Sequence, residues 1–125
     1  MRKRLFSKVF TLGFVVLVVA GCGPASPVFP TGDFIDSEGF VTSFMADGRV
    51  SVSSSITGEV LIENGEYSVD GDIVTITETE LCPPGEGVYR WTLDGDRLLF
   101  ELIEDNCDSR IWALSLELTR YRQGE

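Results

Sequence analysis

Three cysteines carry most of the covalent chemistry open to this 125-residue chain: Cys22, Cys82 and Cys107. A thiol can be acylated, oxidised to a disulfide or deprotonated to bind a metal, and its sequence context indicates which. Cys22 follows four basic residues within residues 2–8, a run of twelve mainly apolar residues at 9–20, and a glycine. That order of basic start, apolar run and small-residue junction predicts an export signal that is cleaved off.

The stretch Val19-Ala20-Gly21-Cys22 resembles the lipobox of bacterial lipoproteins. The resemblance implies cleavage before Cys22, a lipid on its sulfur, and a mature protein anchored on the extracytoplasmic face of a bacterial membrane, within the cell envelope. The alternative is a membrane-spanning helix, which needs about 20 predominantly apolar residues. The run at 9–20 has twelve, so we favour a removed lipoprotein signal peptide over residues 1–21.

The chain from Cys22 onward divides into a short linker and one folded domain. Residues 22–30 include three prolines among small residues, which is typical of an extended tether. The folded domain is expected over residues 31–125. A domain of this length has room for a single hydrophobic core and gains from an added cross-link.

Cleavage leaves a strongly acidic chain. The 104 residues from Cys22 onward contain six arginines, 20 acidic residues, no lysine and no histidine, for a formal charge of −14. Such a surface repels nucleic acid and anionic lipid headgroups, so we expect neither as an electrostatic partner. Attachment to the membrane therefore depends on the acyl chains of Cys22.

Cys82 and Cys107 remain after lipidation of the first cysteine. An even number of cysteines in an oxidising compartment favours a disulfide. Closing a loop of this length contributes roughly 3 to 4 kcal/mol in the chain-entropy account. The alternative is a reactive thiol or a zinc site, but no histidine is present to activate a thiol, and two cysteines would need two further ligands. We expect a structural disulfide and no metal.

The residue types argue against an enzyme. Without histidine or lysine in the mature chain, Ser-His-Asp and Cys-His catalysis, a lysine nucleophile and imidazole metal sites are excluded. Paired carboxylates suit glycosidases, but most acidic residues lie beside turns or on solvent-facing strand positions. An acidic cluster at residues 104–108 offers oxygen ligands for calcium, without the spacing of a known calcium loop. We predict a non-enzymatic protein without a cofactor.

The elements that must position these residues are β-strands. Hydropathy alternates with a period of two, and no stretch shows helical spacing with caps. Asp-Gly or Asn-Gly pairs, which supply the positive φ of tight hairpins, mark reversals at 47–48, 64–65, 70–71 and 94–95. The predicted strands lie near 32–36, 40–46, 49–54, 58–63, 66–69, 72–80, 87–93 and 96–103, with 110–121 as a ninth segment or the closing strand. We predict an all-β, up-and-down antiparallel meander of about eight strands, closed into a barrel because closure removes exposed edges.

Strand register follows from these turns. Two-residue turns at 70–71 and 94–95 pair Tyr67 with Val74 and Trp91 with Leu98, and the turn at 64–65 pairs Ile62 with Tyr67. At 47–48 a bulged three-residue loop is needed to keep apolar residues on one face.

The cysteine pair and its neighbours fit the same topology. In the meander the loops at 81–87 and 104–109 lie at one end, so Cys82 and Cys107 can meet. Arg110 begins the final segment, where it pairs with Asp105 or covers the end of the barrel. Beyond it, alternation predicts a strand with one apolar face made of Trp112, Leu114, Leu116 and Leu118.

The candidate pocket or core lining consists of large side chains on the predicted inner face: Tyr67, Tyr89, Trp91, Phe100, Trp112 and Leu114. A barrel of this size can hold one small apolar ligand. The alternative is that these side chains fill the barrel, since the chain has little volume to spare.

The order of aromatic residues and turns resembles the small lipocalin-like (calycin-type) domains of bacterial lipoproteins. It is carried by Phe44-x-x-Asp47-Gly48-x-Val50, Gly65-x-Tyr67-x-Val69-Asp70-Gly71-Asp72 and Tyr89-x-Trp91-x-Leu93-Asp94-Gly95-Asp96-x-Leu98, with Gly32-Asp33-Phe34 at the place of the opening Gly-x-Trp. The resemblance implies a lipocalin-like barrel and a ligand inside it.

Two functions follow as hypotheses. The leading one is a monomeric, lipid-anchored, extracytoplasmic binding module for a small apolar molecule. The alternative is an acidic protein-interaction lipoprotein, an envelope assembly factor or an inhibitor of a basic enzyme, with a filled barrel. The charge of −14 supports the alternative, which predicts salt-sensitive binding to a basic partner.

Overall fold

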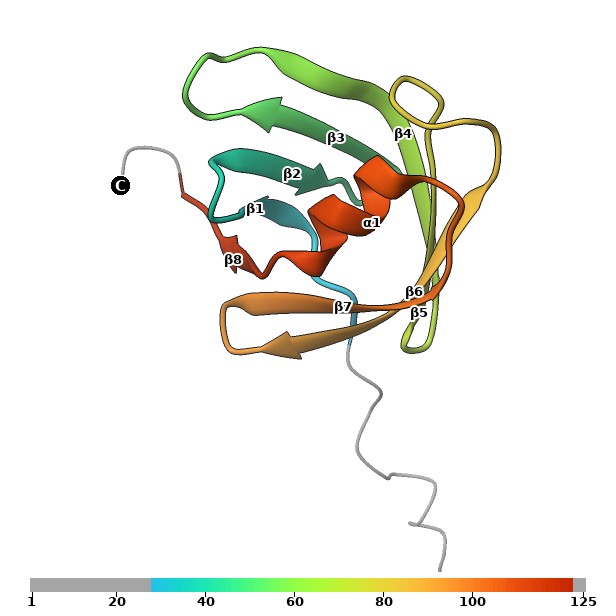
Figure 1. Ribbon diagram of the computed structural model, residues 1–125. Helices are drawn as coiled ribbons and strands as arrows, with labels where there is room; N and C mark the ends of the chain where they lie inside the picture. Colours follow the sequence, from blue (N-terminus) through green and yellow to red (C-terminus); the bar gives the residue numbers. More distant parts are fainter. Residues whose placement is uncertain (1–27, 123–125) are drawn as a thin grey trace, which may run out of the picture.

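The computed structural model describes residues 28–122, so the predicted signal peptide, Cys22 and most of the tether lie outside the described residues. Its elements are β1 Gly32–Ile35, β2 Phe40–Phe44, β3 Arg49–Ser54, β4 Val60–Asp70, β5 Ile73–Thr77, β6 Glu86–Asp94, β7 Arg97–Glu104, α1 Asp108–Ser115 and β8 Leu118–Arg120 (Figure 1). Each strand pairs antiparallel with the next, and β8 pairs with β1. The predicted closed, up-and-down barrel of eight strands is confirmed. Within the described residues, no helix has the length and apolar character needed to span a bilayer.

The seam between β1 and β8 closes the barrel. Phe34 pairs with Arg120, and Ile35 pairs with Thr119. Phe34 is fully buried, and the guanidinium of Arg120 lies 4.8 Å from the centre of its ring. This contact combines hydrophobic burial with a cation–π attraction at the strand pair that leaves no free sheet edge.

The hairpins differ from the predicted register by two residues at two turns. The two-residue loops are 71–72 and 95–96, each beginning with a glycine at φ +63°. Trp91 therefore lies opposite Phe100, and Tyr67 lies opposite Ile76, in place of Leu98 and Val74. The inner face is nevertheless correct, because a shift of two residues preserves the alternation of a strand. At 45–49 the predicted three-residue loop is confirmed: the Met45 N–H donates to the Arg49 carbonyl at 2.8 Å.

The predicted turn at Asn64-Gly65 is wrong. β4 runs through both residues as one strand of 11 residues, so Ile62 and Tyr67 do not pair. Gly65 is buried beside irregular pairing between β3 and β4, and a Cβ there would lie 2.8 Å from both Cγ1 and the carbonyl oxygen of Val50. The absence of a side chain at Gly65 allows the backbones of β3 and β4 to approach closely, which is the second common use of glycine in strands.

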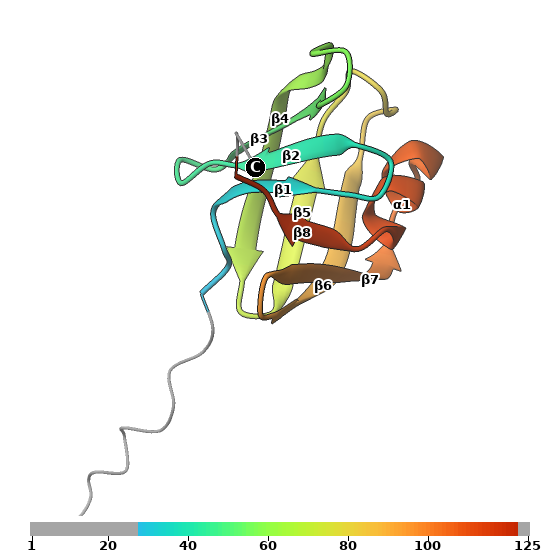
Figure 2. The same ribbon diagram turned by 90° about the vertical axis from the view of Figure 1, so that its left-hand side faces the viewer.

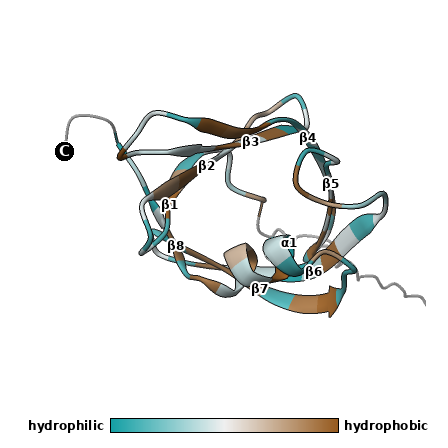
Figure 3. Cartoon of the chain, turned by 45° about the horizontal axis from the view of Figure 1, so that its top comes forward, coloured by the Kyte–Doolittle hydropathy of each residue, from teal (hydrophilic) through white to brown (hydrophobic). Residues whose placement is uncertain are grey.

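The C-terminal segment is the largest departure from prediction. Residues 108–115 form a helix where a strand was expected, and only Leu118–Arg120 continue as a strand. Figure 3 shows the strands as a closed ring with α1 lying against it beside β7. The helical period turns Arg110 and Leu114 inward, four residues apart, and leaves the Trp112 side chain 51% exposed. The prediction that Trp112 shares the apolar face of a strand with Leu114 is therefore wrong.

The aromatic part of the core packs around Phe29. Phe29, placed by sequence in the tether, is buried, and its ring centre lies 5.1 to 5.4 Å from those of Phe44, Tyr67 and Trp91. Figure 2 shows residues 28–31, in blue, on the side of the barrel away from α1. The packed part of the chain thus includes Phe29, and this ring closes the end of the barrel at which the N-terminal segment enters.

Candidate ligand pocket

A pocket of about 500 Å³ occupies the end of the barrel beneath α1. Most of its lining is apolar and comes from β2, β3, the start of β4, the loop after β5, and α1; it includes Phe40, Val52, Leu61, Leu81, Trp112 and Ala113. Small-molecule sites usually measure about 300 to 1,000 Å³. The pocket therefore has the size of a small-molecule site.

Two of the six predicted lining residues, Trp112 and Leu114, reach the pocket. The other four do not line the pocket: Tyr89 and Trp91 belong to the buried core, and the partly buried Tyr67 and Phe100 pack against it. Hydrogen bonds hold two of them there: the Tyr67 hydroxyl donates to the Met45 carbonyl at 2.6 Å, and the Trp91 indole donates to the Gly71 carbonyl at 2.9 Å.

Sequence reasoning missed most of the pocket. Phe40 and Val52 were on the predicted inner face, and the available signal was that Phe40 begins its strand beside the 36–39 hairpin. Leu61 and Ala113 carried no such signal. The wrong turn at 64–65 obscured the position of Leu61, and Ala113 was assigned to a strand because the helix was not predicted.

A buried ion pair holds the first turn of α1 against the barrel. Arg110 donates through Nε and Nη2 to the two carboxylate oxygens of Asp105, both at 2.7 Å, and the two side chains are 5% and 0% exposed. The Tyr89 hydroxyl and the Cys107 N–H also donate to this carboxylate. The predicted pairing of Arg110 with Asp105 is confirmed, and its two-pronged geometry is the strong form of such a bond.

The electrostatics of this cluster keep it ionised. Burial alone raises the pKa of Asp105, but hydrogen bonds from Arg110, Tyr89 and the Cys107 N–H outweigh burial and lower the pKa below 3.8. The hydrogen bond to Asp105 raises the pKa of Arg110. Burial, followed by the Asp105 hydrogen bond, raises the pKa of Tyr89, so its hydroxyl stays a donor.

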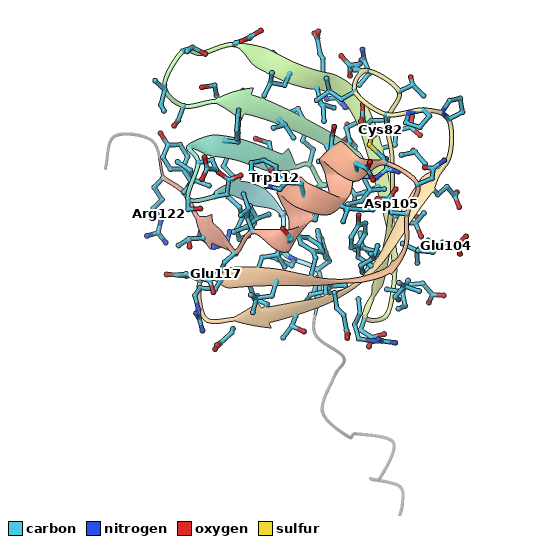
Figure 4. The ribbon with its side chains drawn as sticks, in the orientation of Figure 1. Cys82, Glu104, Asp105, Trp112, Glu117 and Arg122 are labelled. Atoms are coloured by element: carbon cyan, nitrogen blue, oxygen red, sulfur yellow. A yellow bond between two sulfur atoms is a disulfide. The ribbon has the colours of Figure 1, made fainter. Side chains whose placement is uncertain are left out.

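Gly87 makes room for the cluster. A Cβ at this position would collide with the Asp105 carboxylate and would lie 2.6 Å from Arg110 Nε. Asp105 binds Arg110, whereas the exposed Glu104 points away from the barrel (Figure 4), so these two neighbouring carboxylates face different directions.

Two further carboxylates line the pocket and accept hydrogen bonds from backbone N–H groups of the loops around it. Glu78 is 5% exposed, and one of its oxygens accepts the N–H groups of Glu80 and Leu81 at 2.7 and 2.9 Å. Asp36 accepts the N–H groups of Glu38 and Phe40 at 2.8 and 3.0 Å. Both carboxylates thus shape the hairpins that form the wall.

The disulfide between Cys82 and Cys107 is present, as predicted, with the two Cα atoms 5.4 Å apart. It joins the loop after β5 to the residue that precedes α1 (Figure 4). Leu81 and Asp108, the neighbours of the two cysteines, both line the pocket. Among residues 28–122, Glu78 and these cysteines form the group of potential metal ligands that converges, and the disulfide occupies both sulfurs.

One nitrogen of the Arg110 guanidinium makes no hydrogen bond within residues 28–122. Its Nη1 is buried and has no hydrogen-bond partner among the described residues, and the side chain lines the pocket. A buried donor without an acceptor is uncommon in proteins and calls for an explanation.

Comparisons of the chain with family profiles, with curated proteins and with solved structures find no match. The fold and the pocket geometry therefore carry the functional argument by themselves.

Proposed function

We propose that this protein is a binding module that holds one small apolar molecule in the pocket beneath α1. The observation that carries the proposal is an unfilled, largely apolar space of about 500 Å³ between α1 and the packed core. Transfer of apolar ligand surface from water into such a site is favourable by about 25 cal/mol for each Å².

The barrel supports the likeness to lipocalin-like domains. Eight antiparallel strands in sequence order, closed between β1 and β8, enclose an internal site that opens at one end, under a short helix. Barrels of eight strands have an interior just wide enough for side chains or for one small ligand. We propose a member of this class that uses both: side chains at one end and a ligand at the other.

We further propose that the module is attached through a lipid on Cys22 to the extracytoplasmic face of a bacterial membrane. The lipobox-like stretch supports this proposal. The acidic surface is consistent with attachment through acyl chains, because it would repel anionic headgroups.

Binding of the neutral fluorophore N-phenyl-1-naphthylamine to the purified mature protein tests the proposed function. We expect saturable binding to one site in the wild type and at least a tenfold loss in Ala113→Phe, which places a ring in the pocket. Thr92→Phe is the matched control, since Thr92 is an exposed residue on β6 and lies outside the pocket. Absence of saturable binding to the wild type, or equal binding by Ala113→Phe, would overturn the proposal.

A second candidate is recognition of a basic protein. Large apolar side chains are exposed at the pocket end, with Ile56 at 80%, Val60 at 58% and Leu81 at 50%, and the surrounding chain is acidic. Apolar anchors within a charged surface are typical of protein interfaces. Capture of a basic protein that weakens steeply as salt rises would favour this candidate.

A further inference from the structure

We propose that the ligand of the pocket is an amphiphilic amine, a largely apolar molecule whose single cationic ammonium group binds the carboxylate of Glu78, with Asp36 adding to the attraction. This inference rests on the proposed function, because it names the chemical class of the molecule that occupies the same pocket. Three features support it: the charge of the lining, the burial of its carboxylates, and the aromatic side chains around them.

The ionisable side chains that line the pocket carry an excess of negative charge. They are Asp36, Glu78, Asp108 and Arg110. The ion pair with Asp105 neutralises Arg110, so three acidic side chains remain. No ion pair between the described residues includes any of these three. A pocket whose uncompensated groups are all acidic attracts a cation and repels an anion such as a fatty acid.

Glu78 is a buried carboxylate with one oxygen to spare. The residue is 5% exposed, and Oε2 alone accepts the N–H groups of Glu80 and Leu81. Oε1 makes no hydrogen bond within residues 28–122, and it is not among the fully enclosed atoms that lack a partner, so it keeps accessible surface. Glu78 lines the pocket. A carboxylate this buried, without a cationic partner, bears a desolvation cost that an ammonium group supplied by a ligand would offset.

Asp36 has the same arrangement in the hairpin between β1 and β2. Its Oδ1 accepts the N–H groups of Glu38 and Phe40, and the residue is 9% exposed. Its Oδ2 has no hydrogen-bond partner in the described part of the chain and likewise keeps accessible surface. The backbone therefore uses one oxygen of each carboxylate and leaves the other for a ligand.

The rest of the lining favours an organic cation over a metal ion. Within the described residues, the carboxylates of Asp36, Glu78 and Asp108 do not converge into one group of metal ligands. Phe40 and Trp112 line the same space, and the face of an aromatic ring attracts an ammonium group. The remaining side chains are mostly apolar and suit a hydrocarbon body. An amphiphilic amine matches both parts of this lining.

A matched series of eight-carbon competitors tests the inference on the purified mature protein. Octyltrimethylammonium, octan-1-amine, octan-1-ol and octanoate are titrated at pH 7.5, where the amine is protonated, against bound N-phenyl-1-naphthylamine. We expect both cations to displace the fluorophore at concentrations at least tenfold lower than the alcohol does, and octanoate to be the weakest competitor.

Substitutions at the two carboxylates locate the attraction. Glu78→Gln removes the charge and keeps an oxygen that can accept the N–H groups of Glu80 and Leu81. We expect this variant to bind the fluorophore and the alcohol as the wild type does, and to lose most of its preference for the cations. Asp36→Asn should lose a smaller part of that preference.

Glu101→Gln is the matched control for attraction by the acidic surface as a whole. Glu101 is exposed on β7, pairs with Arg90 and lies outside the pocket. We expect this variant to rank the four competitors as the wild type does.

The outcomes separate the two proposals. Failure of the fluorophore to bind the wild type overturns the proposed function. A fluorophore that binds overturns the amine inference alone if the cations compete no better than the alcohol, if a folded Glu78→Gln keeps the full preference, or if Glu101→Gln loses as much of it. If Glu78→Gln does not fold, the ranking in the wild type and in Asp36→Asn decides.

Discussion

At the scale of single residues, the cluster of Arg110, Asp105 and Tyr89 determines how α1 sits on the barrel. Asp105 accepts four hydrogen bonds while fully buried, two from Arg110 and one each from Tyr89 and the Cys107 N–H. Removing one partner of such a pair leaves an uncompensated buried charge, which is far more destabilising than the loss of a surface pair.

We therefore expect Asp105→Asn to lower the free energy of unfolding by about 3 to 5 kcal/mol, measured by urea denaturation at pH 7. Asp94→Asn, at an exposed pair with Arg97, should change it by less than about 1 kcal/mol. Equal effects of the two substitutions would show that the buried pair has no special role.

The same carboxylate predicts a pH dependence. Its pKa is below 3.8 in the folded protein, so its contribution to stability is fully present above the unfolded value and is lost as the pH falls through the folded pKa. The stability difference between the wild type and Asp105→Asn should accordingly shrink below about pH 4. A difference that stays constant down to pH 2 would contradict this assignment.

At the scale of elements, β4 and α1 are the two elements whose secondary structure differs from the predicted one. Gly65 was interpreted as a turn residue because it follows Asn64, but it lies in a strand against Val50. Trp112 and Leu114 alternate as in a strand but lie on a helix whose first turn is fixed by the disulfide and by the Arg110 ion pair.

Matched alanine substitutions distinguish the two uses of glycine. Gly65→Ala should lower the free energy of unfolding by about 1 to 3 kcal/mol, because its Cβ meets Val50 backbone. In Gly95→Ala the new Cβ has no atom within 4 Å, and the only cost is the strain of φ +63°. We therefore expect the free energy of unfolding to fall by about 1 kcal/mol. Thermal and urea unfolding of both variants provide the measurement; a larger effect at Gly95 would favour the turn as the more constrained site.

At the scale of the whole molecule, the pocket and the N-terminal segment lie at opposite ends of the barrel. Phe29 packs into the end remote from α1 (Figure 2), and the seven residue steps from Cys22 to Phe29 span at most about 25 Å. A protein anchored by a lipid on Cys22 would therefore hold its pocket away from that membrane.

This orientation predicts that ligand exchange occurs with the aqueous phase. In lipidated protein on vesicles, with Trp91→Phe to isolate one indole, Trp112 emission should respond to aqueous acrylamide and not to brominated lipid. Quenching by brominated lipid would show that the pocket end contacts the bilayer.

The local sequence determined the all-β class, most strand positions, the inner faces of β5 and β6, the closed barrel and the disulfide. These follow from side-chain alternation, glycine-containing turns and an even cysteine pair, all of which act over a few residues or through simple topology. The pairing of Arg110 with Asp105 was also accessible, because five residues separate them around the cysteine loop.

Only the tertiary structure decided that residues 108–115 form a helix, that Gly65 continues a strand, and that Phe29 enters the core. Each depends on a partner distant in sequence: Cys82 and Tyr89 for α1, Val50 for Gly65, and Trp91 for Phe29. The pocket also depends on the tertiary structure. A cavity forms where side chains from separate elements do not meet, and no local sequence pattern shows where this happens.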